Sequence, residues 1–118
     1  MSDDKSSKMI SPETEYKEIV KAVESGDNKA KTKLAYYILS GYGGCDIDVD
    51  EAVVLLKERV GDEDTEAMWL LGLCYEYGMG CEQDLKEAES LYKQSYDGGN
   101  EVGEFFVKYR FSRQDLSR

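Results

Sequence analysis

An internal repeat of 36 or 37 residues constrains the fold of this chain more than any other feature of its sequence. The segment Ala52-x-x-Leu55-Leu56-Lys57 recurs as Ala88-x-x-Leu91-Tyr92-Lys93, at an offset of 36. The segments Ala30-x-x-x-Leu34-Ala35 and Gly41-x-Gly43 recur as Ala67-x-x-x-Leu71-Gly72 and Gly78-x-Gly80, both at an offset of 37. Repeats of this length are typical of arrays in which neighbouring units stack, because one unit cannot bury its apolar face alone.

The apolar residues inside each unit recur at helical spacing, which predicts helices joined by glycine-containing turns. The expected helices cover about residues 12–25, 28–40, 49–60, 65–77 and 85–96, and a last one begins near Asn100. Aspartate or asparagine precedes most of these segments and glycine follows them, as expected for helix caps. No alternating pattern typical of a β-strand reaches a useful length.

These signals predict an all-α fold, a short α-solenoid of antiparallel helix pairs with about six helices. Two complete pairs are flanked by a half unit on each side, and Gly103-x-x-x-Val107 continues the pattern into the last half. We expect residues 1–11 to be a disordered polar tail, 12–111 the solenoid and 112–118 a basic C-terminal tail. The alternative for the basic end, which carries Lys108, Arg110, Arg113 and Arg118, is that it caps the open end of the solenoid.

The charge balance narrows the classes of partner. The chain has 25 acidic and 15 basic side chains and no histidine, for a net charge of −10. An acid excess repels phosphate backbones, so no nucleic-acid partner is expected. No apolar run approaches the roughly 20 residues needed to cross a bilayer, so no membrane partner is expected either. Histidine, the commonest general base at neutral pH, is missing, which argues against an enzyme.

Three cysteines, an odd number, predict reduced thiols and hence a cytoplasmic protein, a nuclear one not being excluded. We expect Cys74 to be a small buried hydrophobic residue inside a helix. Cys81 is followed by Glu82, whose charge opposes a reactive thiolate. With neither CxxC pair nor histidine, a zinc site is not expected.

Two further motifs have simpler structural interpretations. Asp46-x-Asp48-x-Asp50 resembles the start of a calcium-binding loop, but Glu51 and Lys57 occupy the positions that need glycine and glutamate. The interpretation we favour is a helix N-cap with acids near the positive end of the helix dipole. The glycine turns follow no strand, so they predict helix C-caps and not phosphate loops. The sequence therefore predicts no metal and no cofactor.

The second unit is similar to a known repeat. The stretch Ala67-x-x-x-Leu71-Gly72-x-x-Tyr75-x-x-Gly78-x-Gly80-Cys81-x-x-Asp84-x-x-x-Ala88 resembles the Sel-one-like repeat, a relative of the tetratricopeptide repeat. Cys81 stands where the family usually has valine, and Glu87 where it usually has lysine. The first unit differs more, with Ala35 in place of glycine, Ile38 in place of tyrosine and Gly44 inserted. The resemblance covers about residues 16–111.

The resemblance implies a right-handed superhelix that acts as a non-catalytic adaptor or scaffold and binds a peptide or helix of another protein. In solenoids of this kind the first helix of each unit lines the concave face. The residues expected to bind there are Lys33, Tyr36, Trp69, Leu73, Tyr77, Phe106 and Tyr109, and Thr32 and Phe105 are expected on the same face. Exposed aromatic side chains are typical of interaction surfaces.

Two alternatives remain open at this point. The aromatic rings on the first helices could fill space between short stacked helices instead of binding a partner. The chain could also have a structural role, either as a capping piece of a larger assembly or by self-association through its terminal helices. Two complete units with a half unit on each side are near the lower limit for an independent array.

Overall fold

The fold consists of helices arranged in the order that the repeat predicts. It is described here by a computed structural model, which describes residues 11–41 and 48–111. The elements are α2 (Pro12–Glu24), α3 (Lys29–Ser40), α4 (Val49–Gly61), α5 (Thr65–Tyr77), α6 (Leu85–Asp97), α7 (Glu101–Phe105) and the π-helix η2 (Phe106–Phe111). These described ranges contain no strand, and the all-α prediction is confirmed.

Most helix ends lie at the caps that the sequence predicts. The side chains that accept a hydrogen bond from a first-turn backbone N–H are those of Ser11, Asp48, Asp64, Asp84 and Asn100. Helices α3 and α5 end at Gly41 and Gly78 in the left-handed conformation. Such caps satisfy backbone groups that a helix end otherwise leaves unpaired. Ser11, which we assigned to the N-terminal tail, thus also caps α2. Residues 1–10, 42–47 and 112–118, with the expected tails and Cys45, lie outside the described residues.

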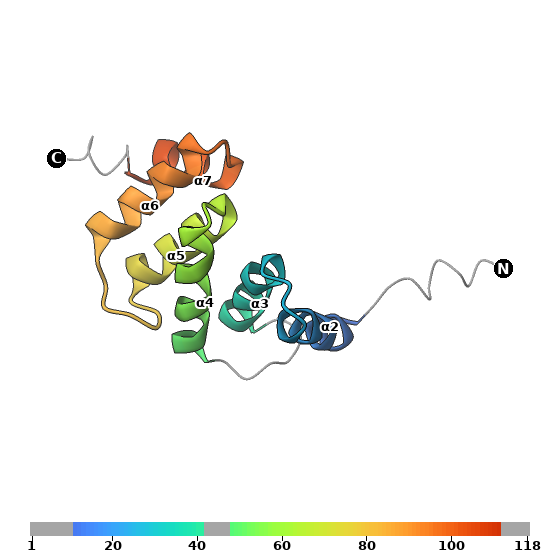
Figure 1. Cartoon of the computed structure of the whole chain (residues 1–118). Helices are drawn as coiled ribbons and strands as arrows, with labels where there is room; N and C mark the ends of the chain where they lie inside the picture. The colour runs from blue at the N-terminus through green and yellow to red at the C-terminus, as the bar shows by residue number, and fades with distance from the viewer. Residues whose placement is uncertain (1–10, 42–47, 112–118) are drawn as a thin grey trace.

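The helix bounds reproduce the sequence repeat. Helices α2 and α4 differ by 37 residues at both ends, and α4 and α6 differ by 36 at both ends. Helices α2, α4 and α6 are therefore the second helices of successive pairs, and α3, α5 and α7 are the first helices. Figure 1 shows them following one another along a curve from α2 to α7.

The packing identifies the inner side of that curve. Each helix packs against the next along the chain, and α5 also contacts α3 and α7. The second helices α4 and α6 make no direct contact with each other in the described part of the chain. Because the first helices lie close together and the second helices lie apart, α3, α5 and α7 are on the concave side. This is the side on which we expected the binding residues.

Small residues let the helices approach closely. Ala35, Ala52, Ala67 and Ala88 are fully buried. A Cβ atom at Gly103 would lie 2.7 Å from the backbone nitrogen of Tyr96, so α7 can contact α6 this closely only with glycine. The buried side chains form two clusters, one from α2 to Leu91 of α6 and one around Tyr92 and Phe106. Trp69 packs against both clusters and joins them.

One left-handed backbone conformation recurs at the turn between units. Gly26 and Gly99 have φ values of 100° and 93°, and Glu63, which lies between them at the same place in the repeat, has a φ of 63°. Glycine adopts this left-handed region freely, whereas a residue with a Cβ atom does so at a cost of about 1–2 kcal/mol. Glu63 is therefore the strained member of three equivalent turns.

Replacement of Glu63 by glycine should stabilise the fold. Relief of the left-handed strain exceeds the entropy that glycine loses on folding, which leaves a gain of about 0.5–1 kcal/mol. Urea unfolding followed by circular dichroism measures this free energy. The control is Asp62→Gly, because Asp62 has a φ of −94° and is ion-paired to Arg59. It should destabilise the protein, and a stabilisation equal to that of Glu63→Gly would contradict the strain at Glu63.

Candidate protein-binding surface

The exposed aromatic side chains of the first helices define the candidate surface. Of the residues predicted to bind, Tyr36, Tyr77 and Tyr109 are 44%, 56% and 58% exposed, and Lys33 is also exposed. Phe105, which we expected on this face but left out of the binding set, is 51% exposed, and its ring centroid lies 5.3 Å from that of Tyr109. Together α3, α5 and α7 thus present several large rings to solvent.

Other predicted residues contribute mainly to the core. Phe106 is only 8% exposed, and its ring stacks on that of Tyr92 with centroids 4.2 Å apart. The prediction that Phe106 is available on the concave face is therefore corrected. Of the two adjacent phenylalanines, Phe106 is the one that packs back toward α6, which leaves its neighbour Phe105 exposed. Spacing alone cannot choose between two adjacent rings.

Trp69, Leu73 and Thr32 are also less available than predicted. Trp69 and Leu73 are half-buried, because both pack against the cluster that contains Phe106. The indole N–H of Trp69 is buried and has no hydrogen-bond partner in the described part of the protein. Thr32 is 6% exposed, and its hydroxyl donates a hydrogen bond of 2.7 Å to Asp64. For these side chains the space-filling alternative describes at least part of their role.

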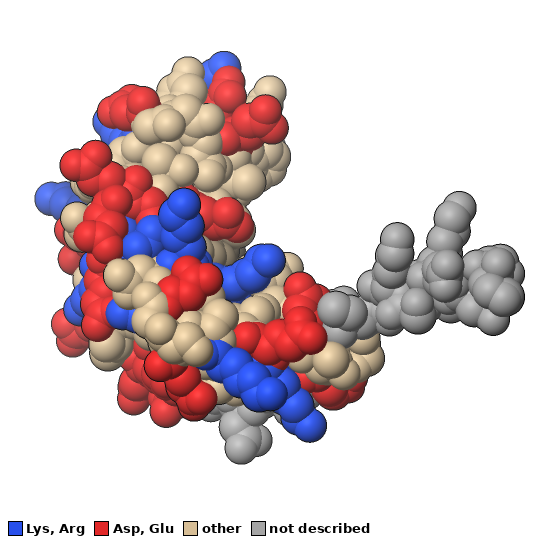
Figure 2. Space-filling view, turned by 45° about the vertical axis from the view of Figure 1, so that its right-hand side comes forward, with Lys and Arg blue, Asp and Glu red and all other residues tan. Residues whose placement is uncertain are grey.

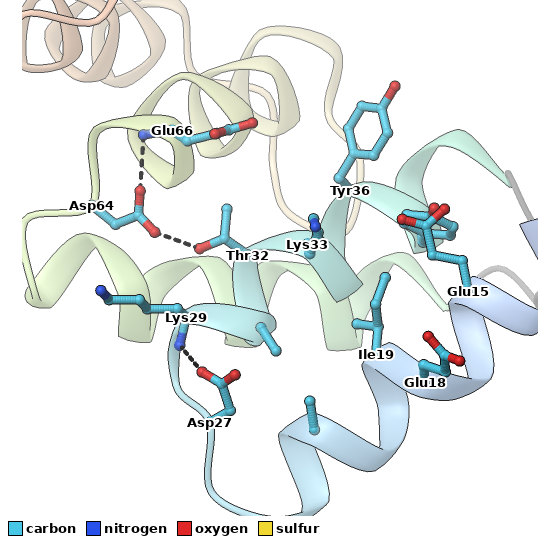
Figure 3. A pocket seen from close by; sticks show the side chains of 13 residues that line it. Glu15, Glu18, Ile19, Asp27, Lys29, Thr32, Lys33, Tyr36, Asp64 and Glu66 are labelled. Carbon is cyan, nitrogen blue, oxygen red and sulfur yellow. Dashed lines mark hydrogen bonds between the residues drawn. The ribbon is translucent and has the colours of Figure 1, made fainter. Parts of the chain in front are cut away.

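A groove of about 710 Å³ lies between α2, α3 and the start of α5. Its walls are formed by Ile19 and Ala22 of α2 and by Ala30, Lys33, Tyr36 and Tyr37 of α3, with acidic residues at the margins. Figure 3 shows Glu15 and Glu18 extending from α2 on one side and Asp64 and Glu66 on the other. Lys33 and Tyr36 are the two predicted binding residues that line this groove.

The groove is predominantly acidic. Five carboxylates line it, those of Glu15, Glu18, Asp27, Asp64 and Glu66, against two lysines, Lys29 and Lys33. Figure 2 shows acidic side chains spread over much of the visible face, with smaller groups of lysine and arginine between them. An acidic concavity with apolar walls favours a ligand that combines basic and apolar groups.

One of these acids holds three helices together. Oδ2 of Asp64 accepts hydrogen bonds from Thr32 of α3 at 2.7 Å and from Nε of Arg59 of α4 at 3.3 Å. Its Oδ1 accepts from the Glu66 and Ala67 N–H groups at the start of α5. Partial burial alone raises the pKa of Asp64, but these hydrogen bonds outweigh it. The pKa of Asp64 therefore lies below its ordinary value of 3.8.

Because the pKa of Asp64 is lowered, the contribution of Asp64 to the free energy of unfolding should depend on pH. A carboxylate with a lower pKa in the folded state stabilises the fold above its unfolded-state pKa, and the stabilisation is lost as the pH falls through the folded-state pKa. Asp64→Asn keeps a capping oxygen but removes the charge that Thr32 and Arg59 bind. We expect it to lower the free energy of unfolding at neutral pH by about 1–2 kcal/mol.

The difference between wild type and Asp64→Asn should begin to shrink below about pH 4, near the unfolded-state pKa, and should disappear as the pH falls through the lower folded-state pKa of Asp64. Urea unfolding across the acid range measures it. The control is Asp62→Asn, because Asp62 pairs with the same arginine at 3.0 Å but its side chain is 62% exposed. That substitution should change stability by less than about 1 kcal/mol. A difference at Asp64 that is independent of pH would contradict an ionic role.

The described cysteines lie in environments that disfavour the thiolate. Cys74 is fully buried, as predicted, and this burial raises the pKa of its thiol to about 12. Cys81 is half-buried, and its pKa is also raised, chiefly by burial, while the nearby Lys57 acts in the opposite direction. The direction expected for Cys81 is thus confirmed, but the cause is burial instead of the charge of Glu82.

These environments predict the order of thiol labelling. At mildly alkaline pH and without denaturant, iodoacetamide should modify Cys74 at least about tenfold more slowly than Cys81, because alkylation needs an accessible thiolate. In urea the two rates should converge. Peptide mapping by mass spectrometry gives the rate at each site. Equal labelling of both cysteines in the folded protein would show that α5 opens readily and would contradict its burial.

The acidic motif that resembles a calcium-binding loop has a structural explanation. Asp48 accepts a hydrogen bond from the Glu51 N–H and caps α4, as the favoured interpretation predicts, whereas Asp46 lies outside the described residues. Within the described ranges, no three cysteine or acidic side chains are grouped as metal ligands would be. No helix among the described elements is both long enough and apolar enough to span a membrane.

Comparisons with known proteins agree with this architecture. The family model for the Sel1 repeat matches residues 28–58 and 65–100, which is more than half of the chain. Human protein sel-1 homolog 2 is 29% identical over 99 residues, which cover 84% of this chain and 14% of that protein. The mouse DAP3-binding cell death enhancer 1 is 36% identical over 55 residues, which cover 47% of this chain and 11% of that protein. The chain thus spans less than a sixth of the length of either relative.

Two solved structures share the fold. A Sel1 repeat protein from Oxalobacter formigenes superposes with a TM-score of 0.67 at 27% identity, covering 78% of this chain and 36% of that one. The protective antigen c5321 of uropathogenic Escherichia coli, which displays an SLR fold, gives a TM-score of 0.67 at 22% identity. That match covers 84% of this chain and 21% of the antigen.

Proposed function

Because the chain belongs to the Sel1 repeat family, we propose that it is a non-catalytic adaptor that binds a peptide or helix of another protein along its concave face. Proteins built from these repeats are generally protein–protein interaction modules. The observation that carries the proposal is a row of large side chains across the concave face. Tyr36, Leu73 and Tyr109 occupy the same position of three successive first helices, at offsets of 37 and 36.

The chemistry of this row suits protein recognition. Tyr36 and Tyr109 are 44% and 58% exposed, although 34% of the chain is charged and could have supplied polar residues at these positions. A tyrosine buries a large area on binding, loses little rotational freedom and keeps a hydroxyl for hydrogen bonding. The central residue of the row, Leu73, is half-buried, so the surface is apolar at its centre and polar at its edges.

The charges around the row indicate the kind of segment that would bind. Tyr36 lines the acidic groove with Glu15 and Glu18, and Lys33 and Lys29 are its two positive charges. A bound segment that presents apolar residues to the tyrosines and basic residues to the groove would satisfy both features. The name of the mouse relative, DAP3-binding cell death enhancer 1, is consistent with a protein as the partner class.

The same proposal places the protein in a reducing compartment, the cytoplasm or the nucleus. It is supported by the odd number of cysteines and by Cys74 and Cys81, which are free thiols in the described part of the protein. A soluble adaptor in such a compartment needs no disulfide, because its helices are held by packing and by caps.

Removal of the exposed tyrosines tests the proposal. The protein is immobilised and exposed to soluble lysate of its source cells, and retained proteins are quantified by mass spectrometry. The double variant Tyr36→Ala, Tyr109→Ala should lose a partner that the wild type retains, by about tenfold or more, because aromatic hot-spot side chains contribute about 2 kcal/mol each to such interfaces. These tyrosines are better probes than Trp69, whose truncation would also open the core.

The matched control removes comparable side chains from the outer helices. Val54 on α4 and Tyr96 on α6 are 58% and 37% exposed. The double variant Val54→Ala, Tyr96→Ala should retain the partner at the wild-type level. Circular dichroism must show both variants to be as helical as the wild type. A partner retained equally by the wild type and the Tyr36, Tyr109 variant would exclude the concave face as the binding surface.

A further inference from the structure

The acidic groove occupies the place of a first helix in the repeat. Four of its lining residues on α2 are Glu15, Glu18, Ile19 and Ala22. At an offset of 37 they correspond to Ala52, Leu55, Leu56 and Arg59 of α4. All four α4 residues are at most 9% exposed, and α3 is the first helix that packs against α4. The groove is therefore the place on α2 where the first helix of its pair would pack, and no described residue fills it.

The other end of the solenoid has the reciprocal feature. Helix α7 and its continuation η2 form a first helix, and no second helix follows them within the described residues. Gly72 of α5 is buried, and a Cβ atom there would lie 2.7 Å from the ring of Tyr92 on α6. Lys108, which corresponds to Gly72 at an offset of 36, has a side chain that is 49% exposed. The face of η2 that would contact a second helix is thus open.

Three residues that depart from the repeat at these two ends are opposite in charge, while Glu104, which corresponds to Met68, is acidic and pairs with Lys108. On α2, Glu15 and Glu18 replace an alanine and a leucine, whereas on η2 Lys108 replaces a glycine. Among the described residues, the acidic residues belong to a second helix whose first helix is not seen, and the lysine belongs to a first helix whose second helix is not seen. Each end is unsuited to an ordinary apolar neighbour, and the two are suited to each other.

We propose that the protein associates head to tail, with α7 and η2 of one copy lying in the groove between α2 and α3 of the next. The contact completes one helix pair of the solenoid from two chains. It goes beyond the proposed adaptor function, because it uses the two ends of the solenoid and needs no other protein.

The repeat gives the expected pairing across this contact. Gly72 lies close to Tyr92, and Lys108 takes the place of Gly72 in the next unit. Ile19, Leu56 and Tyr92 occupy the same position of successive second helices. Lys108 of one copy therefore lies opposite Ile19 of the next. Glu15 and Glu18 are one turn and one residue from Ile19 on α2, within reach of a lysine side chain. In the free chain the ammonium group of Lys108 pairs with Glu104 at 2.6 Å and lies 5.8 Å from the ring centroid of Tyr96 on α6. Both contacts are on the surface and contribute little, so a new partner can replace them.

A second pairing follows from the same register. Lys33 of α3 corresponds to Phe106 at offsets of 37 and 36, and Phe106 lies 6.2 Å from Trp69 of the preceding first helix. Trp69 corresponds in turn to Phe105. Lys33 of one copy would therefore lie over the exposed ring of Phe105 of the other. Its methylene groups cover the ring, and its ammonium group can make a cation–π contact.

This geometry predicts how the mass changes with concentration. A head-to-tail contact leaves a free groove on one copy and a free end on the other, so growth does not stop at the dimer unless a ring closes. Sedimentation velocity of the purified chain, from micromolar to submillimolar concentration, should show an average mass that exceeds that of a dimer. Added salt should weaken the association, because charged groups contribute to it.

Charge reversal tests the proposed residues. Glu18→Lys and Lys108→Glu should each weaken association at least about tenfold, or about 1.4 kcal/mol, because each places like charges at the contact. An equimolar mixture of the two variants should recover association, since every contact between them again pairs a lysine with a glutamate. The control variants Glu82→Lys and Lys93→Glu change the same charges at exposed positions before and on α6. They should associate like the wild type.

Three results would overturn the proposal. The first is a wild-type mass that stays at the monomer, which would leave the groove for a segment of another protein. The second is a mass that saturates at the dimer, which indicates a two-fold contact. The third is a mixture of charge-reversed variants that fails to recover association. These measurements use the purified chain without any partner, so their failure would leave the adaptor proposal untouched.

Discussion

No helix pair in this chain can bury its own apolar face, and the rest of the structure depends on this constraint. Each pair therefore packs against the next, and the packing requires side chains small enough for close approach at fixed positions. Gly103 shows how strict the requirement is, because any Cβ atom there would collide with the backbone of α6. Within the described residues, the same constraint leaves one face uncovered at each end of the stack. The interesting surfaces of the molecule are consequently where the repeat is interrupted, not where it is regular.

At the ends of the stack the side-chain charges differ from those inside the repeat, while the backbone of the repeat is kept. Helix α2 has the same length and register as α4, yet two positions that are alanine and leucine in α4 are glutamates in α2. Glutamates leave the groove accessible to water and prevent an unspecific apolar neighbour from filling it. Asp64 is different, because it lies at the groove's margin but is committed to Thr32, Arg59 and the start of α5. The acidic residues thus have two roles: Asp64 holds the helices together through its hydrogen bonds, whereas Glu15 and Glu18 keep the groove accessible.

Local signals predicted the helices, and tertiary packing decided what they could not. Asp64, Asp84 and Asn100 mark helix starts because a short polar side chain can bond the first-turn N–H groups, which is a property of sequence alone. The choice between Phe105 and Phe106 depends on where Tyr92 lies, so only the folded chain shows which ring is buried. The left-handed Glu63 was missed because glutamate carries no signal for that conformation. Its place in the repeat, between Gly26 and Gly99, was the signal that could have revealed it. The groove follows from the repeat only when the register of α2 is known, and Glu15 and Glu18 conceal that register because they interrupt its apolar pattern.

The two proposed surfaces are coupled by the geometry of the repeat. Tyr36 and Tyr109 are the first and last members of one row on the concave face, and they lie at equivalent positions of α3 and η2. When η2 of one copy lies against α2 and α3 of the next, Tyr109 of the first is followed by Tyr36 of the second at the spacing of one unit. The row then continues across the junction, so assembly lengthens the concave surface and presents it several times. A partner with repeated binding segments would engage such an array more tightly than a single copy, without any new kind of contact. A partner segment that also enters the acidic groove would instead compete with self-association, because η2 of a neighbouring copy fills the same groove.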